Sequence, residues 1–212
     1  MAKRTYSSDG INVHYDVNRC IHAAECVRGA PRVFNPKRRP WIDAEQGQAG
    51  DIAEVVLRCP TGALSFTRKD AGEEERPERL NTVTIQQDGP HYLRGNLQIE
   101  SASGEILSRE TRMALCRCGL SNNKPFCDNS HKASFFDGGE LGSHNSNASD
   151  DADTPLRVIL SENGPLLLRG PAVIVAADGS KVETAKCALC RCGRSSNKPF
   201  CDGTHKEVGF IA

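Results

Sequence analysis

The residues that could do chemistry are cysteines and histidines, which stand in one spacing that occurs twice. Three cysteines and one histidine follow the order C-x-C-x8-C-x3-H, and the same order stands 74 positions earlier. Thiolate sulfur and neutral imidazole nitrogen are soft or borderline donors that bind metals, so the repeat predicts two metal sites of one design. The first set is Cys116, Cys118, Cys127 and His131, and the second is Cys190, Cys192, Cys201 and His205.

The spacing favours a two-iron cluster, in which each iron takes two protein ligands, over a single ion. Zinc sites usually draw on paired C-x2–4-C knuckles, whereas one residue separates Cys190 from Cys192. We expect an irregular loop to hold these two cysteines, because Gly193 and Pro199 disfavour a regular strand there. A single zinc ion and a pair of disulfides are the alternatives. Disulfides are less favoured because each set has three cysteines and the first residues lack the apolar segment of a signal peptide.

The third cysteine and the histidine of each set are spaced for a helical turn. Four positions separate Cys201 from His205, and a turn of helix places such residues on one face. Asp202 is a suitable N-cap for that turn. We therefore expect a short helix at each histidine.

Both sets resemble the CDGSH iron–sulfur family, whose pattern is C-x-C-x2-(S/T)-x3-P-x-C-D-G-(S/A/T)-H. The second set matches every fixed position, and the first departs once, with Asn129 where the family has glycine. Asn tolerates the backbone conformations that Gly permits better than other residues do. The family binds a 2Fe–2S cluster through three cysteines and one histidine, so the resemblance implies one such cluster in each set.

A third group of cysteines lies near the start of the chain. Cys20 and Cys26 have the spacing C-x5-C, and Cys59 is followed by proline. A Cys-Pro pair that closes a distant cysteine cluster is typical of bacterial ferredoxins. Together with C-P-(S/T)-G-A-L, Cys-Val-Arg-Gly and Pro-Trp-Ile segments, these residues resemble a divergent single-cluster ferredoxin domain.

Ordinary ferredoxins have a further cysteine where this chain has Ala23. The resemblance therefore implies that Cys20, Cys26 and Cys59 hold a 3Fe–4S cluster, or a 4Fe–4S cluster whose fourth iron binds His22 or a small external ligand. A surface position is the alternative for His22.

The elements that must position these ligands are short. Alternation predicts strands over 11–17 and 63–66, with a helix over 51–58 between them. In the repeated part, strands are expected at 83–85 and 158–160, and a hairpin turns at Asp178-Gly179. The predicted fold is α+β, with a small ferredoxin-like domain followed by two β-rich CDGSH-type units related by a pseudo-two-fold axis.

Composition suggests where these parts begin and end. A run of charged residues with almost nothing apolar predicts one linker, and a stretch rich in Gly, Ser, Asn and Asp predicts a flexible one. The predicted parts are a ferredoxin-like domain (1–70), a charged linker (71–81), a first CDGSH-type unit (82–137), a flexible linker (138–154) and a second CDGSH-type unit (155–212).

Three further histidines and one further cysteine are expected to bind no metal. We predict that His14, His91 and His144 are unligated surface residues. Cys187 has no counterpart in the first repeat, where Met113 stands, so we predict that it is a small buried side chain.

The overall charge excludes some classes of function. The chain has 27 basic and 27 acidic residues, which gives no electrostatic case for nucleic acid or anionic membrane. No apolar run approaches a membrane span, and ten cysteines without a signal peptide favour the cytoplasm. We expect a monomer, because the second motif supplies the half that single-motif relatives obtain by dimerisation.

No nucleophile–base constellation, phosphate loop or nucleotide motif stands out, so we expect no enzyme. Electron transfer to a redox partner protein is the leading function. Cluster transfer to an apo acceptor, or redox and pH sensing, is the second hypothesis, and a zinc-binding interaction module is the third.

Overall fold

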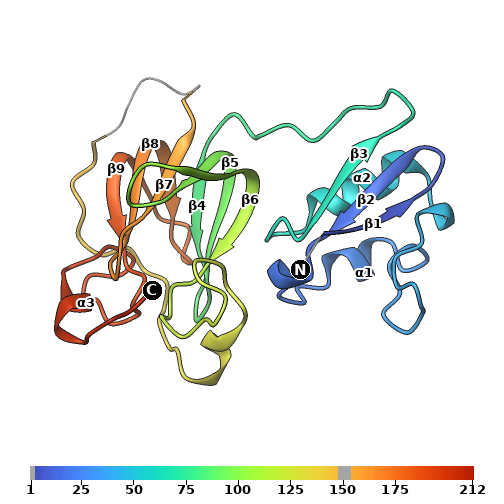
Figure 1. Cartoon of the computed structure of the whole chain (residues 1–212). Coiled ribbons are helices and arrows are strands. Elements are labelled where there is room, and N and C mark those ends of the chain that lie inside the picture. Colours follow the sequence, from blue (N-terminus) through green and yellow to red (C-terminus); the bar gives the residue numbers. More distant parts are fainter. Residues whose placement is uncertain (1–2, 148–153) are drawn as a thin grey trace. The chain divides into compact units, whose positions relative to one another are not determined.

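The computed structural model describes residues 3–147 and 154–212 and divides into two compact units, Met1–Arg76 and Pro77–Ala212 (Figure 1). Each unit has its own buried core. The first unit mixes strands with short helices, and in the second unit strands outnumber helices, which agrees with the predicted α+β and β-rich parts. No helix in the described part of the chain is long and apolar enough to cross a bilayer.

The first unit is a three-stranded antiparallel sheet with short helices. In the central strand, Ile11, Val13 and Tyr15 are buried while the residues between them are partly exposed, the period of two that predicts a half-buried strand. The sheet order is β1-β2-β3. The elements are β1 (Arg4–Ser7), β2 (Ile11–Tyr15), η1 (Val17–Arg19), α1 (Glu25–Gly29), η2 (Ala44–Gln46), α2 (Ala49–Leu57) and β3 (Leu64–Arg68).

The elements predicted here are confirmed with shifted ends. β2 ends at Tyr15 rather than residue 17, because the Asp16 carboxylate accepts a hydrogen bond from Asn18 N and starts the helical turn η1. Helix α2 buries Ile52, Val55 and Val56 in the core of this unit. The short helix α1 was not predicted.

The second unit is built on six strands. They are β4 (Thr82–Ile85), β5 (His91–Glu100), β6 (Ile106–Leu115), β7 (Leu156–Leu160), β8 (Leu166–Val175) and β9 (Lys181–Leu189), with the short helices η3 (Ser130–Ala133) and α3 (Thr204–Glu207). The path runs β4-β5-β7-β8-β9, β6 pairs with β5, and β4 also pairs with β8. The β4–β8 pairing joins both ends of a four-strand path, so these strands form a small barrel.

The two sequence repeats are interleaved in this barrel. Pairings within each repeat are antiparallel, whereas β5–β7 and β4–β8, which join the repeats, are parallel. Side chains of both repeats, such as Leu93 and Leu168, therefore share one buried core. Glu100 on β5 and Arg157 on β7 form a bidentate ion pair at 2.6 and 2.7 Å.

The predicted flexible linker is in part held against the second repeat. Gly142 N donates to Lys198 O at 2.9 Å, and Asn197 Nδ2 donates to Ser143 O at 3.0 Å. The ring of His144 stacks on Phe200 with centroids 4.5 Å apart, so His144 is partly buried rather than on the surface. Composition alone did not indicate these contacts because they depend on the second repeat. Residues 148–153 of the predicted linker lie outside the described residues.

Candidate metal centres

Both CDGSH-type loops begin where a long strand ends. β6 ends at Leu115 and β9 at Leu189, directly before the first cysteine of each set. Each loop then folds back on its strand: Cys116 N donates to Pro125 O, and Cys190 N donates to Pro199 O, both at 2.8 Å. This return brings the third cysteine beside the first two, as the irregular-loop prediction requires.

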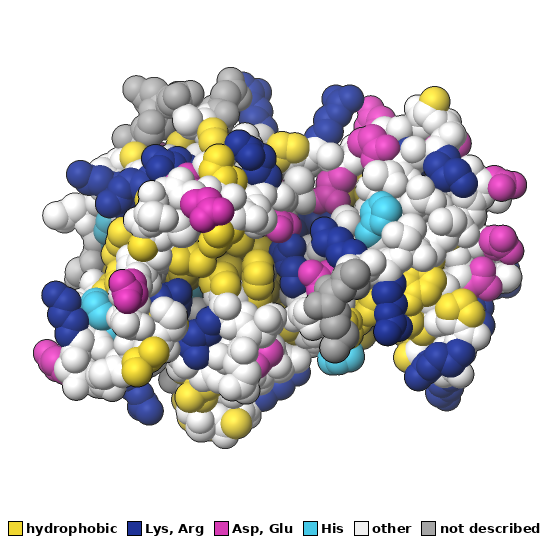
Figure 2. Space-filling view, in the orientation of Figure 1, with side chains coloured by type: hydrophobic (Ala, Val, Ile, Leu, Met, Phe, Trp, Pro, Cys, Tyr) yellow, Lys and Arg dark blue, Asp and Glu magenta, His cyan; other side chains and the backbone are white. Residues whose placement is uncertain are grey.

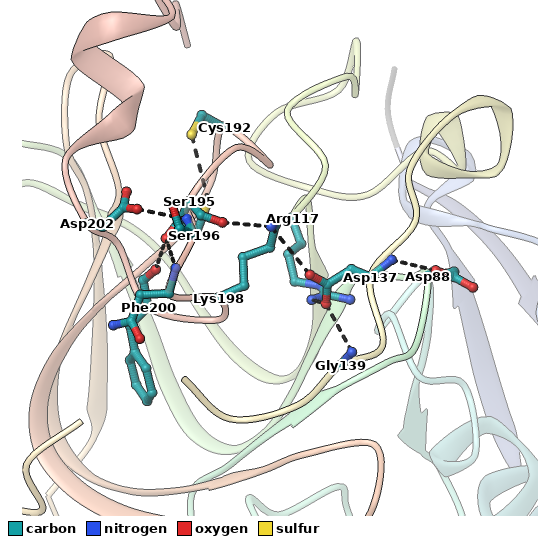
Figure 3. A network of polar contacts seen from close by, with 12 residues as sticks. Asp88, Arg117, Asp137, Gly139, Cys192, Ser195, Ser196, Lys198, Phe200 and Asp202 are labelled. Atoms are coloured by element: carbon teal, nitrogen blue, oxygen red, sulfur yellow. Dashed lines mark hydrogen bonds and ion pairs between the residues drawn. The ribbon is translucent and has the colours of Figure 1, made fainter. Parts of the chain in front are cut away.

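Side chains that the two repeats share hold the loops. The Ser195 hydroxyl donates to Phe200 O at 2.6 Å, and the Asp202 carboxylate accepts from Ser196 N at 2.7 Å (Figure 3). The first loop has the same bonds, from Ser121 to Phe126 O and from Asn122 N to Asp128. The identical residues around the cysteines are therefore explained as loop structure.

The predicted ligands of each set lie in two close pairs. Cys116 Sγ and Cys118 Sγ are 3.7 Å apart, and Cys127 Sγ lies 3.3 Å from His131 Nδ1. Two sulfurs bound at about 2.3 Å to one tetrahedral metal lie about 3.8 Å apart, and a sulfur and a nitrogen about 3.5 Å. Each pair is thus spaced like two ligands of one metal ion, and both are far from the roughly 2.05 Å of a disulfide.

The second set repeats this geometry. Its Sγ–Sγ distance is also 3.7 Å, and its Sγ–Nδ1 distance is also 3.3 Å. Within the described residues, no group of three or more His, Cys, Asp or Glu side chains is placed to hold a single ion. Two pairs per set agree with the donor set of a two-iron cluster.

Burial makes most of these thiols poor acids without a metal. The pKa of Cys127 is raised to about 11 by burial, and burial also raises the pKa values of Cys190 and Cys201. The hydrogen bond between Cys116 and Cys118 lowers the pKa of Cys116 to about 6 and raises that of Cys118. A bound cation would favour the thiolates.

Backbone amides are directed at the sulfurs. Leu120 N donates to Cys118 Sγ, and Asn129 N donates to Cys127 Sγ, both at 3.4 Å. Such donors stabilise thiolate charge and influence the properties of a bound cluster. Asn129 takes the left-handed conformation (φ +74°), as Gly203 does in the second repeat. The prediction that Asn129 can adopt the backbone conformation of the family's glycine is therefore confirmed.

Asp202 is not the N-cap that the sequence predicted. The N-cap residue of α3 is Gly203. Asp202 stands one residue before it, and its carboxylate accepts a hydrogen bond from Thr204 N at 3.0 Å. The left-handed glycine turns the chain between Asp202 and the helix, which the simple capping pattern does not include.

The two sets differ in exposure. His131 is 8% exposed and Cys127 is 3% exposed, while Cys201 and His205 are both partly exposed. Burial, followed by Lys132, lowers the pKa of His131. The second set is therefore the more accessible to solvent.

The two loops touch through glycines. A Cβ at Gly119 would lie 2.5 Å from Cys192 O, and a Cβ at Gly193 would lie 2.4 Å from Cys118 O. Both glycines have positive φ, +80° and +77°. Glycine is required here by conformation and by space, and it lets ligand-bearing backbones of both sets approach one another.

His91 is fully buried, which corrects the prediction of a surface residue. Its Nε2 lies 3.4 Å from Cys190 O, while Nδ1 has no hydrogen-bond partner among residues 3–147 and 154–212. Burial, with Arg117 second, lowers the pKa of His91 to about 3. The residue begins β5, where alternation along the strand directs it into the core. Cys187 is buried, as predicted.

The N-terminal cysteines come together at the ends of three helical turns. Cys20 follows η1, Cys26 lies on α1 and Cys59 follows α2. All three line one pocket, together with Tyr15 and Trp41. The structure therefore assembles the set that the sequence predicted from residues far apart in the chain.

The environment of this pocket resembles that of the other sets. The pKa of Cys26 is raised to about 11, first by burial and then by Cys59. Burial and a hydrogen bond to Cys20 raise the pKa of Tyr15. His22 is exposed and is not among the residues that line the pocket, so the structure does not bring it to the cysteines.

Two sets of three cysteines and one histidine follow β6 and β9, and three further cysteines line a pocket of the first unit. These groups define a metal-binding protein of the iron–sulfur class. Residues 88–132 and 163–206 match the family model described as iron-binding zinc finger CDGSH type, and residues 6–69 match that of the divergent 4Fe-4S mono-cluster. The chain belongs to the tandem CDGSH iron–sulfur family, with a divergent 4Fe-4S mono-cluster domain in front of its two CDGSH units.

Two curated relatives match part of the chain. The chain is 36% identical over 66 residues to the uncharacterized protein YjdI of Escherichia coli strain K12, and equally to the protein of that name in Escherichia coli O157:H7. Each match covers 31% of this chain and 87% of the relative.

Proposed function

We propose that this iron–sulfur protein transfers electrons and carries two 2Fe–2S clusters and one 3Fe–4S or 4Fe–4S cluster. One 2Fe–2S cluster would be held by Cys116, Cys118, Cys127 and His131, and the other by Cys190, Cys192, Cys201 and His205. Cys20, Cys26 and Cys59 would hold the third. The clusters, when bound, supply one-electron chemistry, and the chain contributes ligands, burial and amide donors.

The observation that carries this proposal is the contact between the two CDGSH loops. Gly119 lies against Cys192 O and Gly193 against Cys118 O, so the two ligand sets adjoin within one barrel. Cys116 and Cys190 are each 1% exposed, which keeps water from the thiolates. Adjoining, shielded centres support electron exchange without movement of either loop.

Anaerobic reductive titration of the holoprotein tests electron transfer. Absorbance and paramagnetic resonance would follow reduction by dithionite, and iron would be counted before and after one full cycle. We expect all centres to cycle with the iron retained. Loss of iron upon reduction would contradict a carrier.

Cluster transfer is a second candidate, which the exposure of the second set favours. Cys201 and His205 are partly exposed, whereas Cys127 and His131 are buried. Incubation with an apo-ferredoxin tests transfer directly: a donor loses a 2Fe–2S cluster to the acceptor, from the second set first. The zinc-module hypothesis predicts instead a colourless protein that contains zinc and no iron.

We further propose that the two CDGSH units are related by a pseudo-two-fold axis, within the predicted boundaries 82–137 and 155–212, and that the protein is a monomer. The reciprocal parallel pairings β4–β8 and β5–β7 support this symmetry. Light scattering of the holoprotein would test the monomer.

All ten cysteines are free, which suits the reducing cytoplasm. We propose no catalytic activity, and a redox protein or an apo acceptor as the partner.

A further inference from the structure

A side-chain hydroxyl lies beside a cysteine sulfur in the N-terminal pocket. Thr61 Oγ1 is 3.6 Å from Cys59 Sγ, and Thr61 is 3% exposed. Both residues line the pocket, together with Cys20 and Cys26. The hydroxyl is therefore shielded from water and close enough to the sulfur for a hydrogen bond.

The neighbours of this hydroxyl determine which atom donates. Ala63 N donates to Thr61 Oγ1 at 3.1 Å. A hydroxyl has one proton and two lone pairs, so Thr61 still has its proton to donate. A cysteine sulfur loses its proton when it binds a metal, and a thiolate can only accept. If Cys59 holds a cluster, the Thr61 hydroxyl therefore donates to Cys59 Sγ.

A buried arginine holds the backbone at this position. Arg19 is 5% exposed, and its Nη2 donates to Thr61 O at 2.7 Å. Arg19 directly precedes Cys20, and Thr61 stands two residues after Cys59. The bond thus joins two cysteine-bearing segments that are far apart in the chain, and it keeps the Thr61 hydroxyl next to the sulfur.

The surroundings of the pocket strengthen such a hydrogen bond. Most of the side chains that line it are apolar, among them Ile21, Trp41 and Leu64. Figure 2 shows that hydrophobic side chains, with basic ones beside them, also reach the surface of the first unit. A hydrogen bond in a medium of low polarity is electrostatically stronger than one in water, so a single hydroxyl has a measurable influence in this pocket.

Thr61 differs in kind from the donors in the first CDGSH-type loop. There the backbone amides of Leu120 and Asn129 donate to cysteine sulfurs, and these amides are present whatever the side chain is. At Thr61 the donor is the side chain itself. One substitution therefore removes this hydrogen bond and leaves every backbone group in the chain.

We propose that Thr61 raises the reduction potential of the N-terminal cluster through a hydrogen bond from its hydroxyl to Cys59 Sγ. This inference rests on the proposed function, because it requires a cluster at Cys20, Cys26 and Cys59. An added electron increases the negative charge on the sulfurs, so the hydrogen bond is stronger in the reduced state than in the oxidised state. Thr61 thus favours the reduced form.

The test is a redox titration of the full-length holoprotein with dithionite, followed by paramagnetic resonance of the N-terminal centre. Thr61→Val replaces the hydroxyl with a methyl group. It should lower the equilibrium constant for one-electron reduction about tenfold, which is about 59 mV in potential. Thr61→Ser keeps the hydroxyl and should retain the wild-type potential.

Thr67→Val is the matched control, because it removes a hydroxyl from the same unit away from the pocket. Thr67 is exposed on β3, its Oγ1 lies 3.1 Å from His14 Nε2, and it is not among the residues that line the pocket. The potential of the N-terminal cluster should not change in this variant.

The hydroxyl proton provides a second measurement, which does not depend on a change of potential. Electron–nuclear double resonance of the wild type should show a proton coupled to the N-terminal cluster that disappears after exchange into heavy water. Thr61→Val should lack this proton, and Thr61→Ser should have it. A side chain with only a structural role would give no such coupling.

Iron and sulfide analysis separates this inference from the proposed function. A wild type without an N-terminal cluster would contradict the proposed function. An N-terminal cluster with equal potentials in wild type and Thr61→Val would overturn this inference alone, as would an equal decrease in Thr67→Val. A Thr61→Val protein that lacks the cluster, while Thr61→Ser contains it, would assign the hydroxyl to cluster assembly and would also overturn the inference.

Discussion

At the scale of single residues, histidine would distinguish the proposed 2Fe–2S centres from all-cysteine ones. His131 Nδ1 and His205 Nδ1 each stand 3.3 Å from a cysteine sulfur. A neutral imidazole brings no negative charge to a cluster, whereas a thiolate brings one. The ligand type therefore controls both the reduction potential and the response to acid.

We predict that His131→Cys and His205→Cys each lower the reduction potential of the affected centre by about 100–300 mV. The added thiolate charge disfavours an additional electron, and all-cysteine centres lie well below those with histidine ligands. Spectroelectrochemical titration measures the shift. His14→Ala, outside all three ligand sets, is the control, and an unchanged potential in both ligand variants would show that these histidines are not ligands.

His91 gives a second prediction at this scale, on stability against pH. Its pKa is lowered to about 3 because it is buried, so the unfolded chain takes up a proton below pH 6.5 and the folded chain does not. The free energy of unfolding thus falls by up to about 1.4 kcal/mol per pH unit below 6.5 from this residue. His91 begins β5, and Leu166 stands at the equivalent position at the start of β8. The variant His91→Leu should therefore not show this decrease in the free energy of unfolding.

Urea denaturation of the holoprotein at pH 7 and pH 5 checks the pH effect of His91. His131 and His205 are present in both proteins, so the difference between wild type and variant isolates residue 91. A pH dependence as steep in His91→Leu as in wild type would be inconsistent with a buried neutral histidine.

At the scale of elements, the ligand loops were predictable and their mutual contact was not. Glycine and proline within the ligand motif, such as Gly193 and Pro199, already indicated an irregular loop. Alternation located β2, β4 and the β8–β9 hairpin. The parallel pairings between repeats were missed because the alternation of a strand shows which face is buried, not which strand lies beside it. The burial of His91 was missed because strand β5, which begins at this residue, was not among the predicted elements.

We predict that Gly119→Ala and Gly193→Ala each reduce 2Fe–2S loading, with at least half of the iron of these two centres lost. The new Cβ would stand 2.5 Å (Gly119) or 2.4 Å (Gly193) from a carbonyl oxygen of the other loop. A backbone carbonyl cannot rotate away from this clash as a flexible side chain could. Iron and sulfide analysis of the purified variants measures the loss.

Gly179→Ala is the matched control for these variants. Gly179 also has positive φ, +86°, but nothing lies within 4 Å of an added Cβ. It should lose about 1 kcal/mol of stability and no iron. Equal iron loss at residues 119, 193 and 179 would assign the effect to conformation rather than to contact between loops.

The pair of β5 and β7 offers a prediction about the sheet. Hydrogen bonds from Arg157 hold the pKa of the Glu100 carboxyl below its usual value. A lowered carboxyl pKa contributes stability above about pH 4.5 that is lost as pH falls further. A double-mutant cycle with Glu100→Gln and Arg157→Gln at pH 7 should give a coupling of about 1 kcal/mol, since Arg157 is half-exposed. Additive effects would argue against the ion pair.

At the scale of the whole molecule, the chain contains two units, each with its own core. We predict that Cys59→Ser removes the N-terminal cluster and leaves both 2Fe–2S centres intact. Cys59 lies in the first unit, and all eight CDGSH ligands lie in the second. Paramagnetic resonance with iron analysis distinguishes the centres, and loss of all three together would disprove independence.

The interleaving of the two repeats also has a consequence for synthesis of the chain. β4, β5 and β6 leave the ribosome before β7, yet β5 and β4 find their parallel partners only in β7 and β8. Until the second repeat is translated, the first exposes unpaired strand edges and half of a core. The nascent first repeat is therefore open to association through these edges, and the contact between Gly119 and Cys192 O can form only after β9 has been made.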